Sequence, residues 1–500
     1  MTAYQTAYQT LEARFARIAK LDNALGTLQW DTEVMMPDGA AEARAETTAT
    51  LSVLRHEMLV APELGDLLPE AEADNALDGW QRANLGEMAR LWTHATAVPA
   101  DLVEANSRAV SRCEIAWRTA RKESDFASLL PSLTEVLARQ REIAAVKAAK
   151  LGVPLYDALL DSYEPGGRSD RIDAVFEDLA AFLPGFVDEA LAHQARQPAV
   201  ERPLGPFPVE SQRALGVRLM EAVGFDFDRG RLDISLHPFC GGSDDDVRIT
   251  TRYDEADFTS SLMGVLHETG HALYEQGRPA DWRYQPVGLA RGMSMHESQS
   301  LIIEMQASRS RQFLSYAAPL MRDAFGGSGP AWEADNLYRL YTRVERGFIR
   351  VDADEATYPA HVILRYRLEK ALIEGDMELA DLPEAWNRQM TDMLGVTPPN
   401  DALGCLQDIH WPGGAWGYFP TYTLGAMTAA QLFDAACRAD SDILPGIGRG
   451  DFAPLVGWLR ENVHGQGSRY ATDELLTRAT GRPLDAEVFK RHLRTRYLEA

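Results

Sequence analysis

Apolar residues recur at intervals of three and four along most of this chain, which is the period of one buried face of an α-helix. Clusters of proline and glycine, such as those at 164–167 and 412–414, mark loops between the periodic segments. The pattern therefore predicts a mainly α protein. We expect helices over residues 2–26, 40–60, 80–97, 100–123, 127–150, 170–195, 208–223, 256–277, 294–322, 331–347, 357–376, 424–438 and 484–498.

One region departs from the helical period. Apolar and polar residues alternate over 231–236 and again over 247–250, with a Gly-Gly-Ser-Asp turn at 241–244 between them. This pattern predicts a β-hairpin just before the helix over 256–277, where an edge strand could hold an extended peptide by backbone hydrogen bonds. Since no low-complexity linker interrupts the chain, we expect one large helical domain over residues 1–500.

The composition of the chain indicates which kinds of binding partner are improbable. The chain has 500 residues, of which 50 are Lys or Arg and 74 are Asp or Glu, for a formal net charge of -24. Its 45% hydrophobic and 25% charged residues are typical of a soluble globular protein. An acidic surface of this size argues against nucleic acid or an anionic membrane as the partner. No apolar run approaches the length of a membrane span.

Cysteine usage and the N-terminal segment indicate the compartment. The four cysteines are widely spaced and form no C-x-x-C pattern, which fits free thiols in a reducing environment. The first twenty residues are polar and amphipathic and lack the apolar stretch of a secretory signal. We therefore expect a cytoplasmic protein.

The chemistry is concentrated in an H-E-x-x-H pattern at 267–271. Residues i and i+4 share one face of a helix, so His267 and His271 can bind the same metal ion. A catalytic metal lowers the pKa of the water that it binds toward about 7, and Glu268 is placed to act as the general base. The resulting hydroxide would attack a carbonyl, and the proton would pass to the leaving amine. Zinc-dependent peptide hydrolysis is the natural reaction.

A catalytic zinc usually has three protein ligands and one open position. The metzincin continuation would need glycine and histidine where Tyr274 and Gly277 stand, so it is excluded. We expect the third ligand on the next predicted helix. Glu297 is our first choice, and Glu304, about two helical turns later, is the alternative.

Several ordered motifs resemble one family, the thermostable-type metallocarboxypeptidases or carboxypeptidase Taq family. The six main blocks are His-Pro-Phe at 237–239, Asp-Val-Arg-Ile-Thr at 246–250, the pentad at 267–271, His-Glu-Ser-Gln at 296–299, Ile-Arg-Val-Asp-Ala-Asp at 349–354 and Gly-Cys-Leu-Gln-Asp-Ile-His-Trp at 404–411. Familiar segments also occur at 30–31, 35–37 and 417–422. The likeness spans nearly the whole chain.

This resemblance implies a mainly helical fold with a deep active-site groove, akin to neurolysin and angiotensin-converting enzyme. It implies a homodimer that removes single residues with broad specificity from peptides with a free C-terminal carboxylate. It also implies Zn²⁺ as the metal, with Co²⁺ as a possible substitute, and Glu297 as the ligand beside His267 and His271.

The resemblance further assigns substrate-binding residues. Arg350 would bind the terminal carboxylate bidentately, unless it forms an ion pair with Asp352, Asp354 or Glu355. Arg248 would limit the length of the groove or also contact the terminus, unless it pairs with Asp246. The remaining assignments are His237 and His410 as donors near the substrate or oxyanion, Tyr422 or Tyr418 as a hydroxyl donor to the oxyanion, and Gln407 and Asp408 as groups that orient a ligand histidine.

Two other functions use the same residues. An oligoendopeptidase or dipeptidase on this scaffold would share the catalytic core, so the pentad does not discriminate between internal and terminal cleavage. A metal-stabilised helical scaffold without catalysis would not need the base Glu268.

Overall fold

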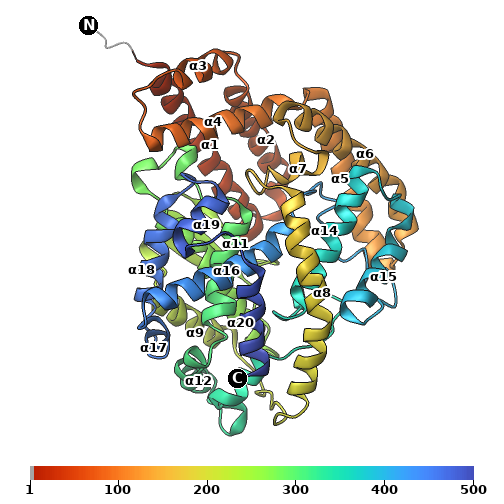
Figure 1. Cartoon of the computed structure of the whole chain (residues 1–500), viewed down its shortest axis with the longest axis vertical. Coiled ribbons are helices and arrows are strands. Elements are labelled where there is room, and N and C mark those ends of the chain that lie inside the picture. Colours follow the sequence, from red (N-terminus) through yellow and green to blue (C-terminus); the bar gives the residue numbers. More distant parts are fainter. Residues whose placement is uncertain (1–4, 500) are drawn as a thin grey trace.

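The computed structural model describes residues 5–499 and is built almost entirely of helices (Figure 1). The predicted mainly α class is confirmed. The start of the helix predicted over 2–26 lies outside the described residues, and the helix itself continues further than predicted. The first half of the chain forms α1 (Ala7–Val34), α2 (Ala41–Leu59), α3 (Glu63–Glu72), α4 (Gly79–Ala97), α5 (Ala100–Glu123), α6 (Phe126–Leu151), α7 (Leu155–Leu160), α8 (Ser169–Gln194) and α9 (Val209–Val223).

The second half follows a short sheet and is also helical. It comprises α10 (Phe258–Gly277), α11 (Met293–Leu301), α12 (Arg311–Phe325), α13 (Ala334–Tyr341), α14 (Tyr358–Glu374), α15 (Leu382–Leu394), α16 (Pro420–Ala439), α17 (Ile443–Ile447), α18 (Ala453–Asn462), α19 (Thr472–Thr480) and α20 (Ala486–Leu498). None of the helices within residues 5–499 is long and apolar enough to cross a membrane.

The sheet corrects the predicted hairpin. Its order is β1 (Gly230–Ile234), β3 (Asp246–Thr251), β2 (Cys240–Ser243), with β1 parallel to β3 and β2 antiparallel to it. The two predicted strands are therefore neighbours, but they run in the same direction. Alternation reveals which face of a strand is buried but not its direction. Side chains support the return of the chain, since Ser235 Oγ donates to the carbonyl of His237 at 2.6 Å and lies 2.7 Å from Thr250 Oγ1.

The helix predicted over 294–322 is also interrupted. After α11, a π-helical turn covers Ile302–Ala307, and α12 starts afresh with Ser310 as its N-cap. The Ser310 hydroxyl accepts from the backbone N–H of Phe313 at 3.1 Å, which satisfies a donor that a continuous helix would have used internally. The apolar period runs through this break, which is why the sequence pattern predicts one helix there.

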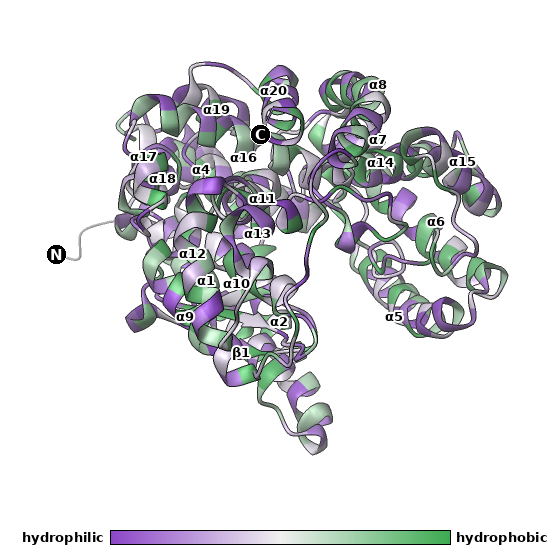
Figure 2. Cartoon of the chain, turned by 90° about the horizontal axis from the view of Figure 1, so that it is seen from below, coloured by the Kyte–Doolittle hydropathy of each residue, from purple (hydrophilic) through white to green (hydrophobic). Residues whose placement is uncertain are grey.

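Helices α1–α4 form a layer with its own hydrophobic core at the upper end of Figure 1. A much larger core joins the remaining helices, and a small third core lies between the sheet, α9 and α10. Seen from below, α5, α6 and α15 lie on one side of the molecule and α9, α10 and α12 on the other (Figure 2). A hollow of about 260 Å³ lies between α1 and the segment that follows α10, and a second of about 210 Å³ lies between α4 and the start of α11, where it reaches His296.

Candidate active site

Helix α10 carries the pentad and α11 brings a carboxylate against it. The Nε2 atoms of His267 and His271 lie 3.9 and 3.5 Å from Oε2 of Glu297. One donor atom from each of these three residues falls within 4.8 Å of the other two. Two ligands that are each about 2.0–2.1 Å from a tetrahedral ion are about 3.3 Å apart, so this donor set fits a divalent metal.

Two glycines allow this close approach. A Cβ on Gly270 of α10 would lie 2.3 Å from the carbonyl oxygen of Gln299 and 2.6 Å from Cα of Ser300, both on α11. A Cβ on Gly425 of α16 would lie 2.8 Å from both Cβ and Cγ of Glu297. Only glycine lets α10, α11 and α16 pack at these distances, so the helix crossing itself places the carboxylate beside the two imidazoles.

The outer nitrogen of each predicted ligand histidine has a partner. His267 Nδ1 lies 2.9 Å from Oε2 of Glu304, which pairs in turn with Arg309. His271 Nδ1 lies 2.7 Å from Nδ1 of His296, and His296 Nε2 lies 2.9 Å from Oε1 of Glu275. Glu304, the alternative third ligand, thus contacts the far side of a ligand histidine instead.

These orienting partners differ from those expected. Gln407 and Asp408 were the candidates, but within residues 5–499 the two Nδ1 atoms are met by Glu304 and His296. His296 stands in one of the motifs, yet Glu275 has no motif of its own. Glu275 follows His271 by four residues on a buried helix, and this spacing was the one feature of the sequence that could have indicated its role near His271.

Burial and charge set the protonation of the site. Burial raises the pKa of Glu268 to about 7, with Glu297 adding to the effect and His267 opposing it. For Glu297, burial is outweighed by the hydrogen bond to His271 and the charge of His267, and its pKa falls to about 2. Burial lowers the pKa of His271 to about 4. For His267, burial is outweighed by the hydrogen bond to Glu304 and the charge of Glu297, and its pKa rises to about 10. The site therefore holds an ionised Glu297, a protonated His267, a neutral His271 and a carboxyl group poised near neutrality.

Buried polar contacts fix the N-terminus of α11. The backbone N–H of Ser294 donates to Oε2 of Glu164 at 3.0 Å, and Thr472 Oγ1 donates to the other carboxylate oxygen at 2.7 Å. The backbone N–H of Met293 donates to the carbonyl of Tyr163 at 2.7 Å. A carboxylate at the start of a helix is stabilised by the helix dipole, so these contacts hold the helix that carries Glu297.

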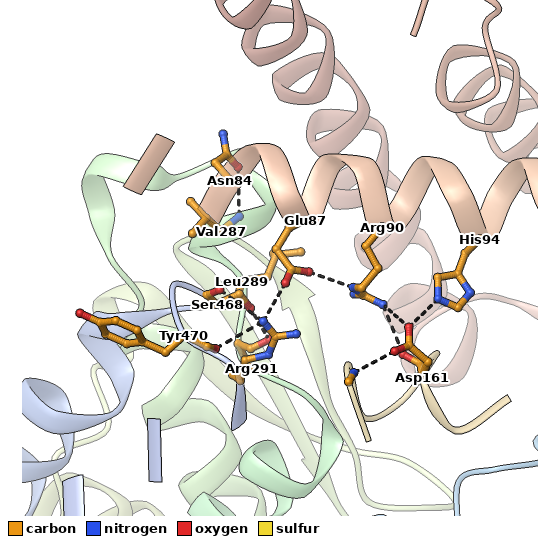
Figure 3. A network of polar contacts seen from close by, with 12 residues as sticks. Asn84, Glu87, Arg90, His94, Asp161, Val287, Leu289, Arg291, Ser468 and Tyr470 are labelled. Carbon is orange, nitrogen blue, oxygen red and sulfur yellow. Dashed lines mark hydrogen bonds and ion pairs between the residues drawn. The ribbon is translucent and has the colours of Figure 1, made fainter. Parts of the chain in front are cut away.

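A second set of contacts ties the same region to α4 (Figure 3). Arg291, just before α11, donates from Nη1 to Glu87 on α4 at 2.7 Å, and Glu87 also accepts from Arg90 at 3.0 Å. Arg90 and His94 both contact Asp161, the latter at 2.7 Å. The layer of α1–α4 is thus linked to the active-site helices by charged groups rather than by a shared apolar core.

Arg350 lies in a buried charge cluster, with Asp408 as its partner rather than any of the three expected acids. Its Nε and Nη2 donate to Oδ1 of Asp408 at 3.1 and 3.0 Å, while Arg365 Nε donates to Oδ2 at 2.6 Å. The charges of the two guanidinium groups outweigh burial and hold the pKa of Asp408 below its ordinary value. Gln407 supports the cluster by accepting from the backbone N–H of Arg350 at 2.9 Å.

Helix α16 connects this cluster to the candidate metal-binding residues. The guanidinium of Arg350 lies over the ring of Tyr422, 4.8 Å from its centroid. Tyr422 precedes Gly425 by three residues on α16, so both face the same way, and Gly425 packs on Glu297. His410 Nε2 lies 3.1 Å from the Tyr422 hydroxyl, and the Tyr418 ring meets that of Tyr422 at 5.1 Å. Tyr422 therefore links Arg350 and His410 to the helix that packs on Glu297.

Arg248 and His237 are placed differently. Arg248 forms the alternative pair with Asp246, at 3.0 and 2.6 Å, and its guanidinium lies 4.2 Å from the ring centroid of Trp30. His237 is exposed in the loop between β1 and β2, where its backbone carbonyl accepts from Ser235. Both lie at the sheet that packs against α10.

Comparison with known proteins identifies the family of the chain. Residues 10–497 match the family model described as carboxypeptidase Taq (M32) metallopeptidase. The chain is 38% identical to "Thermostable carboxypeptidase 1" of Thermus thermophilus, over 99% of this chain and 98% of the relative, and 34% identical to "Carboxypeptidase 1" of Bacillus subtilis, over 96% of each.

Among solved structures, "Trypanosoma Cruzi Metallocarboxypeptidase 1" superposes with a TM-score of 0.97 at 42% identity and covers 98% of this chain and 99% of its own. The M32 carboxypeptidase from Deinococcus radiodurans R1 superposes with a TM-score of 0.93 at 35% identity, over 99% of each chain. The chain therefore belongs to the carboxypeptidase Taq (M32) family of metallopeptidases, enzymes that hydrolyse peptides.

Proposed function

We propose that this protein is a zinc-dependent carboxypeptidase that removes single C-terminal residues with broad specificity. The observation that carries the proposal is that α16 packs on Glu297 of a candidate three-ligand group and also presents Tyr422 to Arg350. The candidate group also adjoins Glu268, a carboxyl group suited to general base catalysis. His267, His271 and Glu297 would hold the ion, and Co²⁺ is a plausible substitute because the donor set suits both. When bound, the ion would polarise the scissile carbonyl and acidify water.

Glu268 would take a proton from water and pass it to the leaving amine. A general base works best when its pKa lies near the operating pH, and burial brings the pKa of Glu268 to about 7. Burial also raises the pKa of Tyr422 to about 12 and lowers that of His410 to about 4. At neutral pH Tyr422 keeps its hydroxyl hydrogen and His410 stays neutral, so both can serve as donors to a developing oxyanion.

The charge balance around Asp408 supports recognition of a C-terminus. Arg350 and Arg365 share the single carboxylate of Asp408, which leaves one positive charge in a buried cluster. The bonds to Asp408 use Nε and Nη2 of Arg350, and a guanidinium has five N–H donors. Arg350 therefore retains donors, and the cluster retains a charge, for the terminal carboxylate of a peptide.

The remaining site assignments are part of the proposal. We assign Arg248 to limiting the length of the groove and Tyr418 to lining its wall. We assign His237, in the exposed loop between β1 and β2, to contacting the substrate. The protein would act as a homodimer, which predicts a solution mass of about twice 55.4 kDa by light scattering. We also propose a cytoplasmic location, which the four unpaired cysteines support because free thiols persist in a reducing environment.

The test compares two variants on matched peptides. Glu268→Gln should retain zinc and lose peptide turnover, whereas normal turnover would refute its role as the base. Arg350→Met should slow cleavage of a free-acid peptide at least tenfold and hardly change the slow cleavage of its C-terminal amide. Arg388→Met, at an exposed helix position, is the matched control and should behave like the parent. Equal loss on both peptides would contradict the role of Arg350.

A further inference from the structure

The two proposed ligand histidines are oriented by different devices. His267 has a direct hydrogen-bond contact to the carboxylate of Glu304, at 2.9 Å. His271 instead contacts a second imidazole, His296, at 2.7 Å, and the carboxylate stands one step further away, at Glu275. A contact between two ring nitrogens forms a hydrogen bond only if one of them carries a hydrogen and the other does not. The His271 branch therefore constrains two rings at once.

The chemistry at both ends selects one arrangement of hydrogens. His271 must present a lone pair on Nε2, which faces Glu297 at 3.5 Å, so its hydrogen resides on Nδ1. His296 Nδ1 must then accept, and the hydrogen of His296 resides on Nε2. That hydrogen points to Oε1 of Glu275, which accepts as a carboxylate. The reverse arrangement would place two hydrogens, or none, between neighbouring atoms of the chain.

Glu275 is held as an acceptor by fixed positive charge. Arg278 Nε lies 3.0 Å from its Oε2, and Arg278 also pairs with Asp244 in the turn between β2 and β3. Burial opposes the ionised carboxylate, but the charge of Arg278 and the hydrogen bond to His296 together outweigh it and lower the pKa of Glu275 to about 2. Asn23 Nδ2 of α1 donates to Asp244 at 3.1 Å. The branch thus runs from the ligand to the first helix of the N-terminal layer.

We propose that His296 and Glu275 are positioning residues that set the tautomer and ring orientation of His271, and so the affinity of the metal site. The inference rests on the proposed ligand role of His271, but it concerns binding of the ion and not hydrolysis. Partners that orient a ligand histidine typically contribute 10- to 100-fold to metal affinity. These contacts run from His271 to Asp244, so the orientation of His271 depends on the packing of α10, α11 and the β2–β3 turn.

The test uses zinc affinity, measured by competition with a chromophoric chelator. His296→Leu removes the acceptor and should weaken zinc binding about 10- to 100-fold. His296→Gln can offer its amide oxygen to His271 Nδ1 and should recover most of that loss. Glu275→Leu should weaken binding by a similar factor, because the tautomer of His296 is then no longer specified.

The chain offers a matched control. His492 makes the same type of contact, Nε2 to Oε1 of Glu355 at 2.8 Å, and is 19% exposed compared with 18% for His296. His492→Leu should leave zinc affinity unchanged while lowering the melting temperature. The positioning role is wrong if the zinc affinity of His296→Leu is within about threefold of the parent, or is no lower than that of His492→Leu. Failure of the parent to bind zinc would instead refute the proposed metal site.

Nitrogen-15 spectra of the zinc-loaded protein report the tautomers directly. We expect the hydrogen of His271 on Nδ1 and that of His296 on Nε2. A hydrogen on Nδ1 of His296 would overturn the proposal even if every variant lost affinity. This measurement distinguishes orientation of His271 by His296 and Glu275 from a loss of zinc affinity that merely reflects poorer folding.

Discussion

Replacing Asp408 by asparagine removes the only negative charge that Arg350 and Arg365 share at that point. The change preserves shape, yet one carboxylate oxygen becomes an amide nitrogen that faces a guanidinium donor. Arg365 is fully buried and Arg350 is 6% exposed, so neither cation can turn to solvent. Removing one partner of a buried ion pair costs about 3–5 kcal/mol, mainly because the remaining charge is left uncompensated. Asp408→Asn should lower the free energy of unfolding by that amount.

The matched control is Asp473→Asn. Asp473 pairs with Arg171 at 2.7 Å, but the two side chains are 58% and 73% exposed. An exposed pair of this kind contributes at most about 1 kcal/mol. Urea unfolding of the metal-free proteins, followed by circular dichroism, measures both losses under the same conditions. A loss for Asp408→Asn below about 1 kcal/mol, or equal to that of the control, would refute the argument from buried charge.

Three further predictions follow from packing and charge. Gly425→Ala should weaken zinc binding at least tenfold, because the new Cβ would lie 2.8 Å from Glu297, whereas Gly457→Ala, with open space around it, should bind normally in the same chelator competition. Unchanged affinity for Gly425→Ala would contradict the close-packing argument. Glu355→Gln should lower the unfolding free energy by about 3–5 kcal/mol in urea, since it leaves buried Arg496 without its partner at 2.8 Å; a loss below 1 kcal/mol would count against it. Burial keeps certain histidines neutral in the folded, metal-free protein, whereas the same residues take up a proton near pH 6.5 once the chain unfolds. Each such histidine should lower the free energy of unfolding by about 2 kcal/mol between pH 7 and pH 5. Equal urea midpoints at the two pH values would disprove this. These histidines, whose pKa values fall to about 3, 4 and 3, are His361, His410 and His464.

The candidate metal-binding group could be predicted from the sequence because part of its geometry is local. Residues 267–271 lie on one turn of a helix, and a turn of α-helix places i and i+4 together wherever it occurs. The choice of Glu297 over Glu304 was less secure from spacing alone. It depends on where α11 crosses α10, and this crossing is set by the absence of a side chain at Gly270 and Gly425.

The missed features depend on contacts between distant segments. Asp408 was expected to orient a ligand histidine, but it pairs with Arg350 and Arg365 across the fold. The parallel pairing of β1 with β3 depends on the loop between them, which alternation does not describe. Short helices were also missed where proline stands in the first turn, as at Pro383 of α15 and Pro454 of α18, because such residues resemble loop signals.

We propose that the zinc-dependent site removes residues from the free C-terminus of a peptide. The most direct measurement is a time course of mass spectra for a ten-residue peptide digested by the zinc-loaded protein, with a chelator-treated sample alongside. We expect a ladder of products that lose one residue at a time from the C-terminus, and no products after chelation. Internal fragments, or a ladder that persists without metal, would contradict it.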